Sequence, residues 1–77
     1  MHYEINVSKK NDRGDYIHYF ATHKRSITNQ ARLKVIVEDF LTRFPKPEFN
    51  ILVTLQEERG VSMDGNAFIE NPDKLTI

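Results

Sequence analysis

The segment ITNQARLKVIVEDFLTRFP, from Ile27 to Pro45, has the strongest structural pattern in the chain. Large apolar residues recur through it at helical spacing, and they are Leu33, Ile36, Val37, Phe40, Leu41 and Phe44. Residues three and four positions apart lie on one side of an α-helix, so the pattern predicts an amphipathic helix. We expect the hydroxyl of Ser26 or Thr28 to cap its N-terminus, and Pro45 to end it, because proline cannot continue a helix.

Two segments before this helix alternate between apolar and polar residues, as half-buried strands do. The first is HYEINVS at residues 2–8, and the second is YIHYFAT at residues 16–22. Between them, NDRG at residues 11–14 is typical of a type I turn closed by a glycine bulge. Such a turn places Asn11 opposite Asp15 and so fixes how the two strands pair.

The pairing decides which side chains face the helix, because a shift of one residue moves a side chain to the other face of a sheet. Counting outward from the turn gives the pairs Val7–Tyr19, Asn6–Phe20 and Ile5–Ala21. The side beneath the helix is then expected to hold Ile5, Val7, Ile17, Tyr19 and Ala21. The opposite, open face is expected to hold Tyr16, His18, Phe20 and Thr22, beside Glu4, Asn6 and Ser8. The aromatic row of the second strand is therefore predicted to face away from the helix.

A third strand is predicted after the helix, where FNILVTLQ at residues 49–56 alternates again. Placing it beside the first strand gives a two-layer α+β domain of ββαβ topology over residues 1–77. Its antiparallel sheet has the order 2-1-3, and one helix covers one face. Residues 57–77 are weakly specified by the sequence pattern, and we expect them to be peripheral. Asp64-Gly65 favours a turn, so this segment is expected to form a short hairpin or an extended tail.

Composition narrows the classes of function. The 77 residues include eleven basic and eleven acidic residues and no cysteine. A chain without cysteine has neither disulfides nor thiolate metal sites and suits a reducing compartment, so we expect a cytoplasmic protein. No apolar run is long enough for a signal peptide or a membrane span, so no membrane partner is expected. A net charge of zero argues against a dedicated nucleic-acid domain.

Candidate catalytic and metal-binding residues do not combine into a site. Ser8 and His18 are expected to face each other across the first two strands, as a nucleophile and a base would. A solvated sheet face offers them neither an oxyanion hole nor a carboxylate that orients the imidazole. His18 and His23 lie an odd number of residues apart and point to opposite faces, which disfavours a metal site. We therefore expect no enzymatic activity, no cofactor and no small-molecule substrate.

The open sheet face and the hairpin beside it form the predicted binding surface, since an exposed aromatic patch with a polar rim is typical of interaction sites. Its members are Lys9, Lys10, Arg13, Tyr16, His18, Phe20, Lys24 and Arg25. The first hypothesis is a protein-binding module of inhibitor or adaptor type, whose partner is a larger protein or a second copy of the chain. The second is weak nucleic-acid binding, with the basic residues on phosphates and Tyr16 and Phe20 on bases.

One alternative would remove this surface. Phe68 and Ile69 could fold back over the sheet and bury Tyr16 and Phe20 as a second small core. In size and in its economy of one helix and one sheet, the chain is similar to the compact inhibitor proteins that phages and mobile elements produce. No motif carries that likeness, which concerns architecture and implies only an inhibitor-type role.

Overall fold

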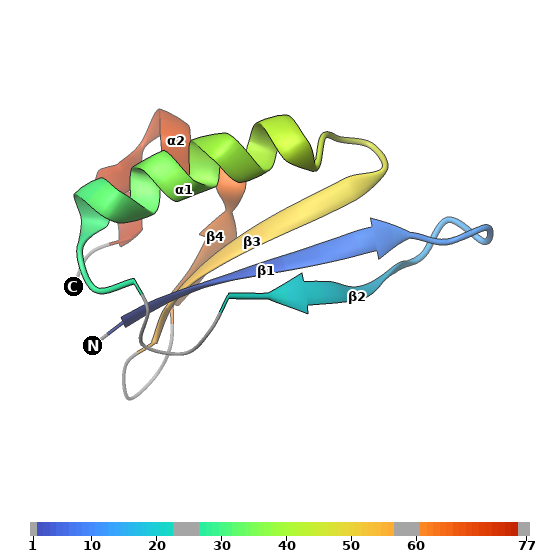
Figure 1. Ribbon diagram of the computed structural model, residues 1–77, viewed down its shortest axis with the longest axis horizontal. Helices are drawn as coiled ribbons and strands as arrows, with labels where there is room; N and C mark the ends of the chain where they lie inside the picture. Colours follow the sequence, from blue (N-terminus) through green and yellow to red (C-terminus); the bar gives the residue numbers. More distant parts are fainter. Residues whose placement is uncertain (1, 23–26, 57–60, 76–77) are drawn as a thin grey trace.

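The computed structural model describes residues 2–22, 27–56 and 61–75, and Figure 1 shows their arrangement. The elements in chain order are β1 (His2–Lys10), β2 (Tyr16–Ala21), α1 (Gln30–Arg43), β3 (Phe49–Gln56), β4 (Val61–Asp64), α2 (Gly65–Glu70) and a 3-10 helix, η1 (Pro72–Leu75). The strands form one antiparallel sheet in the order β2-β1-β3-β4. The predicted α+β architecture with its order 2-1-3 is therefore confirmed, and β4 extends the sheet on the β3 side.

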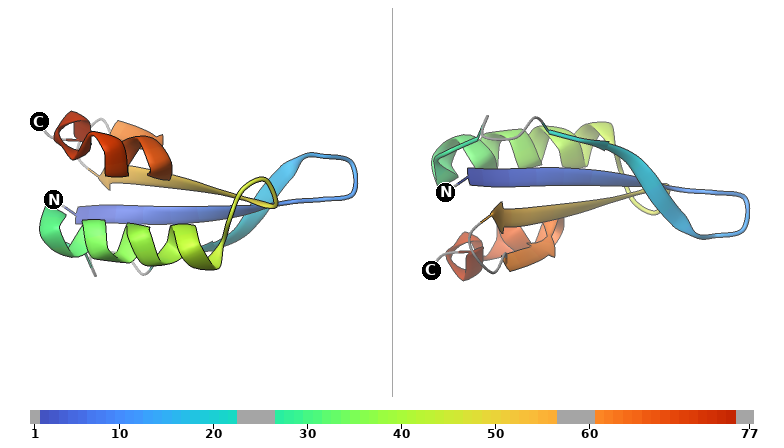
Figure 2. Two further views of the ribbon diagram at one scale, coloured as in Figure 1. Left: turned by 90° about the horizontal axis from the view of Figure 1, so that it is seen from above. Right: turned by 90° about the horizontal axis from the view of Figure 1, so that it is seen from below.

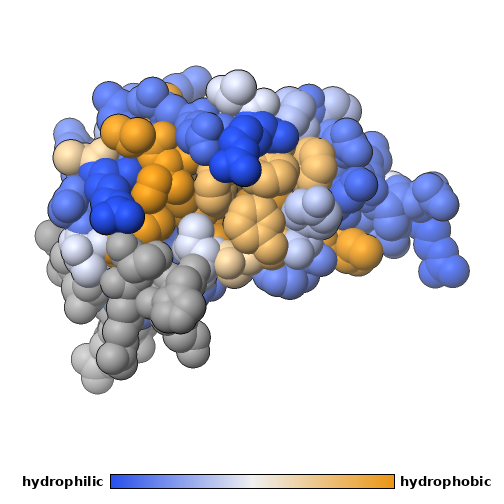
Figure 3. All heavy atoms as spheres, in the orientation of Figure 1, coloured by the Kyte–Doolittle hydropathy of each residue, from blue (hydrophilic) through white to orange (hydrophobic). Residues whose placement is uncertain are grey.

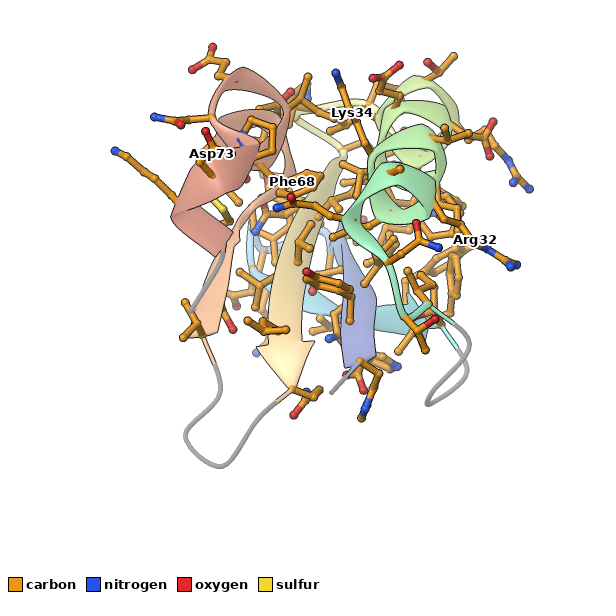
Figure 4. All side chains as sticks on the ribbon, turned by 90° about the vertical axis from the view of Figure 1, so that its left-hand side faces the viewer. Arg32, Lys34, Phe68 and Asp73 are labelled. Atoms are coloured by element: carbon orange, nitrogen blue, oxygen red, sulfur yellow. The ribbon has the colours of Figure 1, made fainter. Side chains whose placement is uncertain are left out.

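Both α-helices lie on the same face of the sheet (Figure 2). Seen along the strands in Figure 4, α1 lies above the side of β1 and β2, and α2 lies beside it above the side of β3 and β4. Helix α2 contacts α1, β3 and β4. The opposite face carries no helix among the described residues (Figure 2, right), and the hairpin of β1 and β2 projects beyond the end of α1 (Figure 1).

Helix α1 begins later than the hydroxyl residues suggested. Asn29 is its N-cap, and the side-chain oxygen of Asn29 accepts a hydrogen bond from the Arg32 amide at 2.7 Å. The prediction of Thr28 as the cap is wrong, and Ser26 lies outside the described residues. The reason lies in Ile27, which is buried and whose carbonyl accepts the Tyr3 amide at 2.9 Å. Ile27 therefore pairs with β1 like a strand residue, and the helix begins only after it.

The core is one cluster between the sheet and the helices. Strands β1 and β3 and helix α1 contribute the residues that their periods predict, and Ile27 and Phe68 join them. The buried members are Tyr3, Ile5, Val7, Ile27, Leu33, Val37, Phe40, Ile51, Val53, Leu55 and Phe68. Burying one such side chain contributes about 1.5–3 kcal/mol. The predicted helix stripe is confirmed, because its other members, Ile36, Leu41 and Phe44, pack against this cluster.

The predicted turn between the first two strands is present. The Asn11 amide donates to the Asp15 carbonyl at 2.8 Å, and the Gly14 amide donates to the Asn11 carbonyl at 3.0 Å. Gly14 has φ of +88°, a left-handed conformation that glycine adopts without strain. The side-chain oxygen of Asn11 also accepts hydrogen bonds from the amides of Arg13 and Asp15, so this one residue provides partners for two backbone amides of the turn.

The C-terminal segment differs from prediction. Asp64-Gly65 begins helix α2 instead of turning a hairpin, and the Asp64 carboxylate accepts the amides of Asn66 at 3.0 Å and Ala67 at 3.4 Å. A Cβ at Gly65 would stand 3.0 Å from Ile51 Cγ2, so glycine allows α2 to approach the sheet closely. Phe68 is fully buried in the core on the helix side (Figure 4). The alternative in which Phe68 covers the open face is therefore wrong.

Candidate functional site

The pairing of β1 with β2 changes register part-way along the strands. Lys10 pairs with Tyr16, and Ser8 pairs with His18, as the turn predicts. Beyond this point Val7 pairs with Phe20 and not with Tyr19, because one extra residue of β2 is inserted as a β-bulge. The predicted pairs Val7–Tyr19, Asn6–Phe20 and Ile5–Ala21 are therefore wrong.

Hydrogen bonds at the far end of β2 hold the shifted register. The Thr22 amide donates to the Ile5 carbonyl at 3.0 Å, and the Ile5 amide donates to Thr22 Oγ1 at 3.1 Å. Thr22 and not Ala21 thus lies opposite Ile5, while Ala21 pairs with Asn6 on the open side of the sheet. The expectation that Ala21 lies beneath the helix is wrong for the same reason.

The bulge turns Phe20 toward the helix, so the prediction that Phe20 lies on the open face is also wrong. The Phe20 ring meets the rings of Phe40 and Phe44 edge to face, with centroids 5.5 Å and 5.4 Å apart. Tyr19 lies on the same side, as predicted, with its centroid 6.1 Å from Phe44 and 5.5 Å from Phe49. Covering the Phe20 ring with helix α1 offsets the loss of regular pairing at the bulge.

These contacts form a cluster that is only partly covered. Ile17 is 56% exposed and Tyr19 is 52% exposed, while the three phenylalanine rings beside them are half-buried. Figure 3 shows apolar side chains gathered on this face, between α1 and β2. We call this surface the apolar seam: Tyr19, Phe20, Phe44 and Phe49 are joined by ring contacts, and Ile17 lies on the same face of the sheet.

Two cations border the seam. Lys9 Nζ lies 5.9 Å from the Tyr19 ring centroid and 5.8 Å from that of Phe49. Arg43 Cζ lies 5.8 Å from the Phe44 ring centroid, and the Arg43 guanidinium also pairs with Asp39 at 3.1 Å. Both side chains are largely exposed, and exposed pairs of this kind contribute about 0–1 kcal/mol. The seam therefore has an apolar centre and a charged rim.

The open face is mainly polar. The register places on it Asn6, Ser8, His18, Asn50, Leu52 and Gln56. Asn6 donates to the Glu4 carboxylate at 2.8 Å, and the Tyr16 hydroxyl donates to the Pro47 carbonyl at 2.5 Å. The aromatic row predicted for this face is reduced to Tyr16 and His18. Among the described residues no group of three or more potential metal ligands occurs.

The predicted site residues do not gather on one surface. Lys9 lies on the helix side, Arg13 lies in the exposed turn, and Lys10 pairs with Tyr16 at the hairpin end of the open face. Lys24 and Arg25 lie outside the described residues. The predicted binding surface did not include Ile17, Tyr19, Phe44 and Phe49. The sequence offered no clear signal for the bulge, since Tyr16-Ile17 and Tyr19-Phe20 are both neighbouring apolar pairs and only the second lies at the bulge.

Comparison of the chain with family models, curated proteins and solved structures finds no match. No helix in the described part of the chain combines the length and the apolar character needed to cross a membrane. A functional assignment consequently depends on the surface that the residues themselves build.

Proposed function

We propose that this protein is a non-enzymatic binding module that acts by protein–protein interaction through the apolar seam. The observation that carries the proposal is the exposure of Tyr19, whose ring meets three further apolar rings, together with exposed Ile17 on the same face of the sheet. Interfaces are enriched in aromatic side chains at their centre and in polar residues at their rim. The seam has this arrangement, with Lys9 and Arg43 at its border. We place this activity in the cytoplasm, which the absence of cysteine favours.

The position of the seam supports a binding role over a purely structural one. Tyr19 is the bulged residue, and bulges commonly re-aim a side chain at the edge of a sheet. Regular pairing would have set Phe20 on the open face and away from the Phe40 ring. The bulge instead brings two adjacent rings to one side, where Phe20 completes the core contact and Tyr19 stays accessible. A ring that is half in contact and half exposed is suited to act as an anchor for a partner.

Nucleic-acid binding, the alternative from sequence, has less support from these contacts. It needed Tyr16 and Phe20 as stacking rings on one face, but Phe20 packs against Phe40 on the other side of the sheet. Tyr16 remains, and its hydroxyl is hydrogen-bonded to Pro47.

The test compares proteins captured from a lysate of the source cells by immobilised wild-type chain, by Tyr19→Ser and by Val35→Ser. Val35 is 69% exposed on α1 and lies outside the seam, so Val35→Ser removes a similar exposed apolar group elsewhere. We expect at least one captured protein whose recovered amount is about tenfold lower with the Tyr19→Ser chain than with the wild-type chain. With the Val35→Ser chain the amount should equal that of wild type. The captured proteins are quantified by mass spectrometry, and copies of this chain captured from the lysate are counted among them.

Two results would contradict the proposal. One is that no captured protein, including further copies of the chain, depends on Tyr19. The other is salt-dependent binding of a short single-stranded oligonucleotide that Tyr19→Ser leaves unchanged, which would favour the nucleic-acid alternative.

A further inference from the structure

We infer that the partner of the apolar seam is a second copy of this chain, joined by antiparallel pairing of the two β2 strands about a twofold axis at Ile17. The inference rests on the proposed function and names its partner. The pairing would merge two four-stranded sheets into one, with both α1 helices on the same face.

The outer side of β2 offers backbone groups for such pairing. Hydrogen-bonded and non-hydrogen-bonded pairs alternate along an antiparallel ladder. The Asn11–Asp15 pair is hydrogen-bonded, so the alternation makes Lys9–Ile17 a hydrogen-bonded pair as well. The amides and carbonyls of Tyr16 and His18 then point away from β1. Within the described residues, β2 is an end strand of the sheet and no strand pairs with that side.

Strand β2 lacks most of the features that keep edge strands single. Proteins usually protect such strands with lysine, proline, inward charges or bulges. The six residues YIHYFA of β2 include no proline, no lysine and no acidic residue. The bulge at Tyr19 protects only part of the strand, because Tyr16, Ile17 and His18 keep their regular pairing with β1. An uncharged strand with high β-propensity and no proline pairs readily with another of its kind.

An axis at Ile17 satisfies both backbone and side chains. Tyr16 would form a hydrogen-bonded pair with His18 of the second copy, and His18 with Tyr16 of the second copy. Ile17 would then face its own counterpart in a non-hydrogen-bonded pair, where Cα atoms are about 4.5 Å apart and side chains touch. Both copies of Ile17 lie on the helix side, so the contact covers the most exposed member of the seam.

The distribution of charge favours self-pairing in this direction. Antiparallel strands send the two hairpin turns to opposite ends of the dimer, so the charged residues Arg13 and Asp15 of one copy stay away from those of the other. The stretch that does meet, from Tyr16 to His18, has no acidic residue, lysine or arginine. A strongly charged partner would find no opposite charge on this strand, whereas a second copy meets an uncharged strand like its own.

A single cysteine tests the geometry, because the natural chain has none. A non-hydrogen-bonded antiparallel pair brings Cα atoms within disulfide range. We expect purified Ile17→Cys to form a covalent dimer under mild oxidation. Val61→Cys is the matched control, since Val61 is a branched aliphatic residue on the other edge strand with 43% exposure. We expect this control to stay largely monomeric, and equal cross-linking of the two variants, or of neither, would overturn the inference.

Light scattering over a concentration series gives the second measurement. We expect wild type to reach twice the chain mass of 9.1 kDa, and Ile17→Lys to raise the dissociation constant about tenfold or more. Val61→Lys should leave the dimer intact. A wild-type dimer that Ile17→Lys does not weaken would overturn the placement of the axis. A wild-type monomer at every concentration, together with Tyr19-dependent capture of a different protein, would overturn the self-pairing and leave the proposed binding function standing.

Discussion

The sheet ends in two unlike edges. On the β4 side, Asp64 caps α2, η1 contacts the strand, and Phe68 is fully buried against the shared core. On the β2 side, the strand is uncharged, and Ile17 and Tyr19 keep more than half of their surface exposed. The same helix-bearing face of one sheet is therefore closed at one flank and open at the other.

The two edges show how a small chain distributes its apolar residues between core and surface. A domain of this size buries a modest fraction of its surface, so each large apolar side chain counts toward stability. Helix α2 and Phe68 complete the core over β3. Over β2, the corresponding rings are stacked edge to face but left partly in water. An open flank built from aromatic rings is consistent with a partner that covers it.

The largest effect is expected where the closed flank is broken. Phe68→Ala removes a fully buried ring, and such truncations cost about 3–5 kcal/mol. Tyr19→Ala removes a ring that is half exposed, so we expect a loss of less than about 1 kcal/mol in the monomer. Urea unfolding followed by circular dichroism measures both. Equal losses for the two variants would show that the flanks do not differ in their contribution to the core.

Much of the open flank, on the β2 side, could be predicted from sequence, as far as the residue at which the bulge begins. The turn chemistry of Asn11 and Gly14 fixes the register as far as the Ser8–His18 pair. Beyond it, the bulge depends on whether the Phe20 ring finds cover from Phe40, which lies twenty residues away in a different element. That is a tertiary energy, and strand alternation carries no information about it. The predicted aromatic face consequently failed at Phe20 and held at Tyr16 and His18.

The structure of the closed flank, on the β4 side, could not be predicted from sequence for another reason. Asp64-Gly65 has the chemistry of a turn and also that of a helix N-cap followed by a first helical residue. The six residues of α2 are too few to show a helical period. Contacts with distant residues decide the outcome, including Ile51 beside Gly65 and the Gln30 side-chain amide, which donates to the Pro72 carbonyl at 2.7 Å. The choice between a turn and a helix N-terminus is therefore made by contacts of the folded chain.

An intermediate effect is expected at the β4 edge from the cap itself. Asp64→Ala removes the acceptor of two α2 amides and one partner of the ion pair with Lys46, whose Nζ lies 3.2 Å from Asp64. We expect a loss of about 1–2 kcal/mol, as for other N-caps. Lys46→Ala removes only the exposed ion pair and should cost about 0–1 kcal/mol. If both variants unfold at the same urea concentration, the cap does not secure α2 at this edge.

A smaller effect than that of the Asp64 cap is expected at the open edge, in the turn that sets its register. Gly14→Ala should cost about 1 kcal/mol, because φ of +88° is disfavoured for a residue with a Cβ. Space is not the cause, since the nearest atom to that Cβ is Lys10 Cε at an ordinary 3.7 Å. Gly14→Asn separates the two explanations: asparagine tolerates the left-handed region, so it should lose less stability than alanine despite its larger side chain. Urea midpoints that rank asparagine below alanine would mean that steric crowding and not backbone conformation selects glycine here.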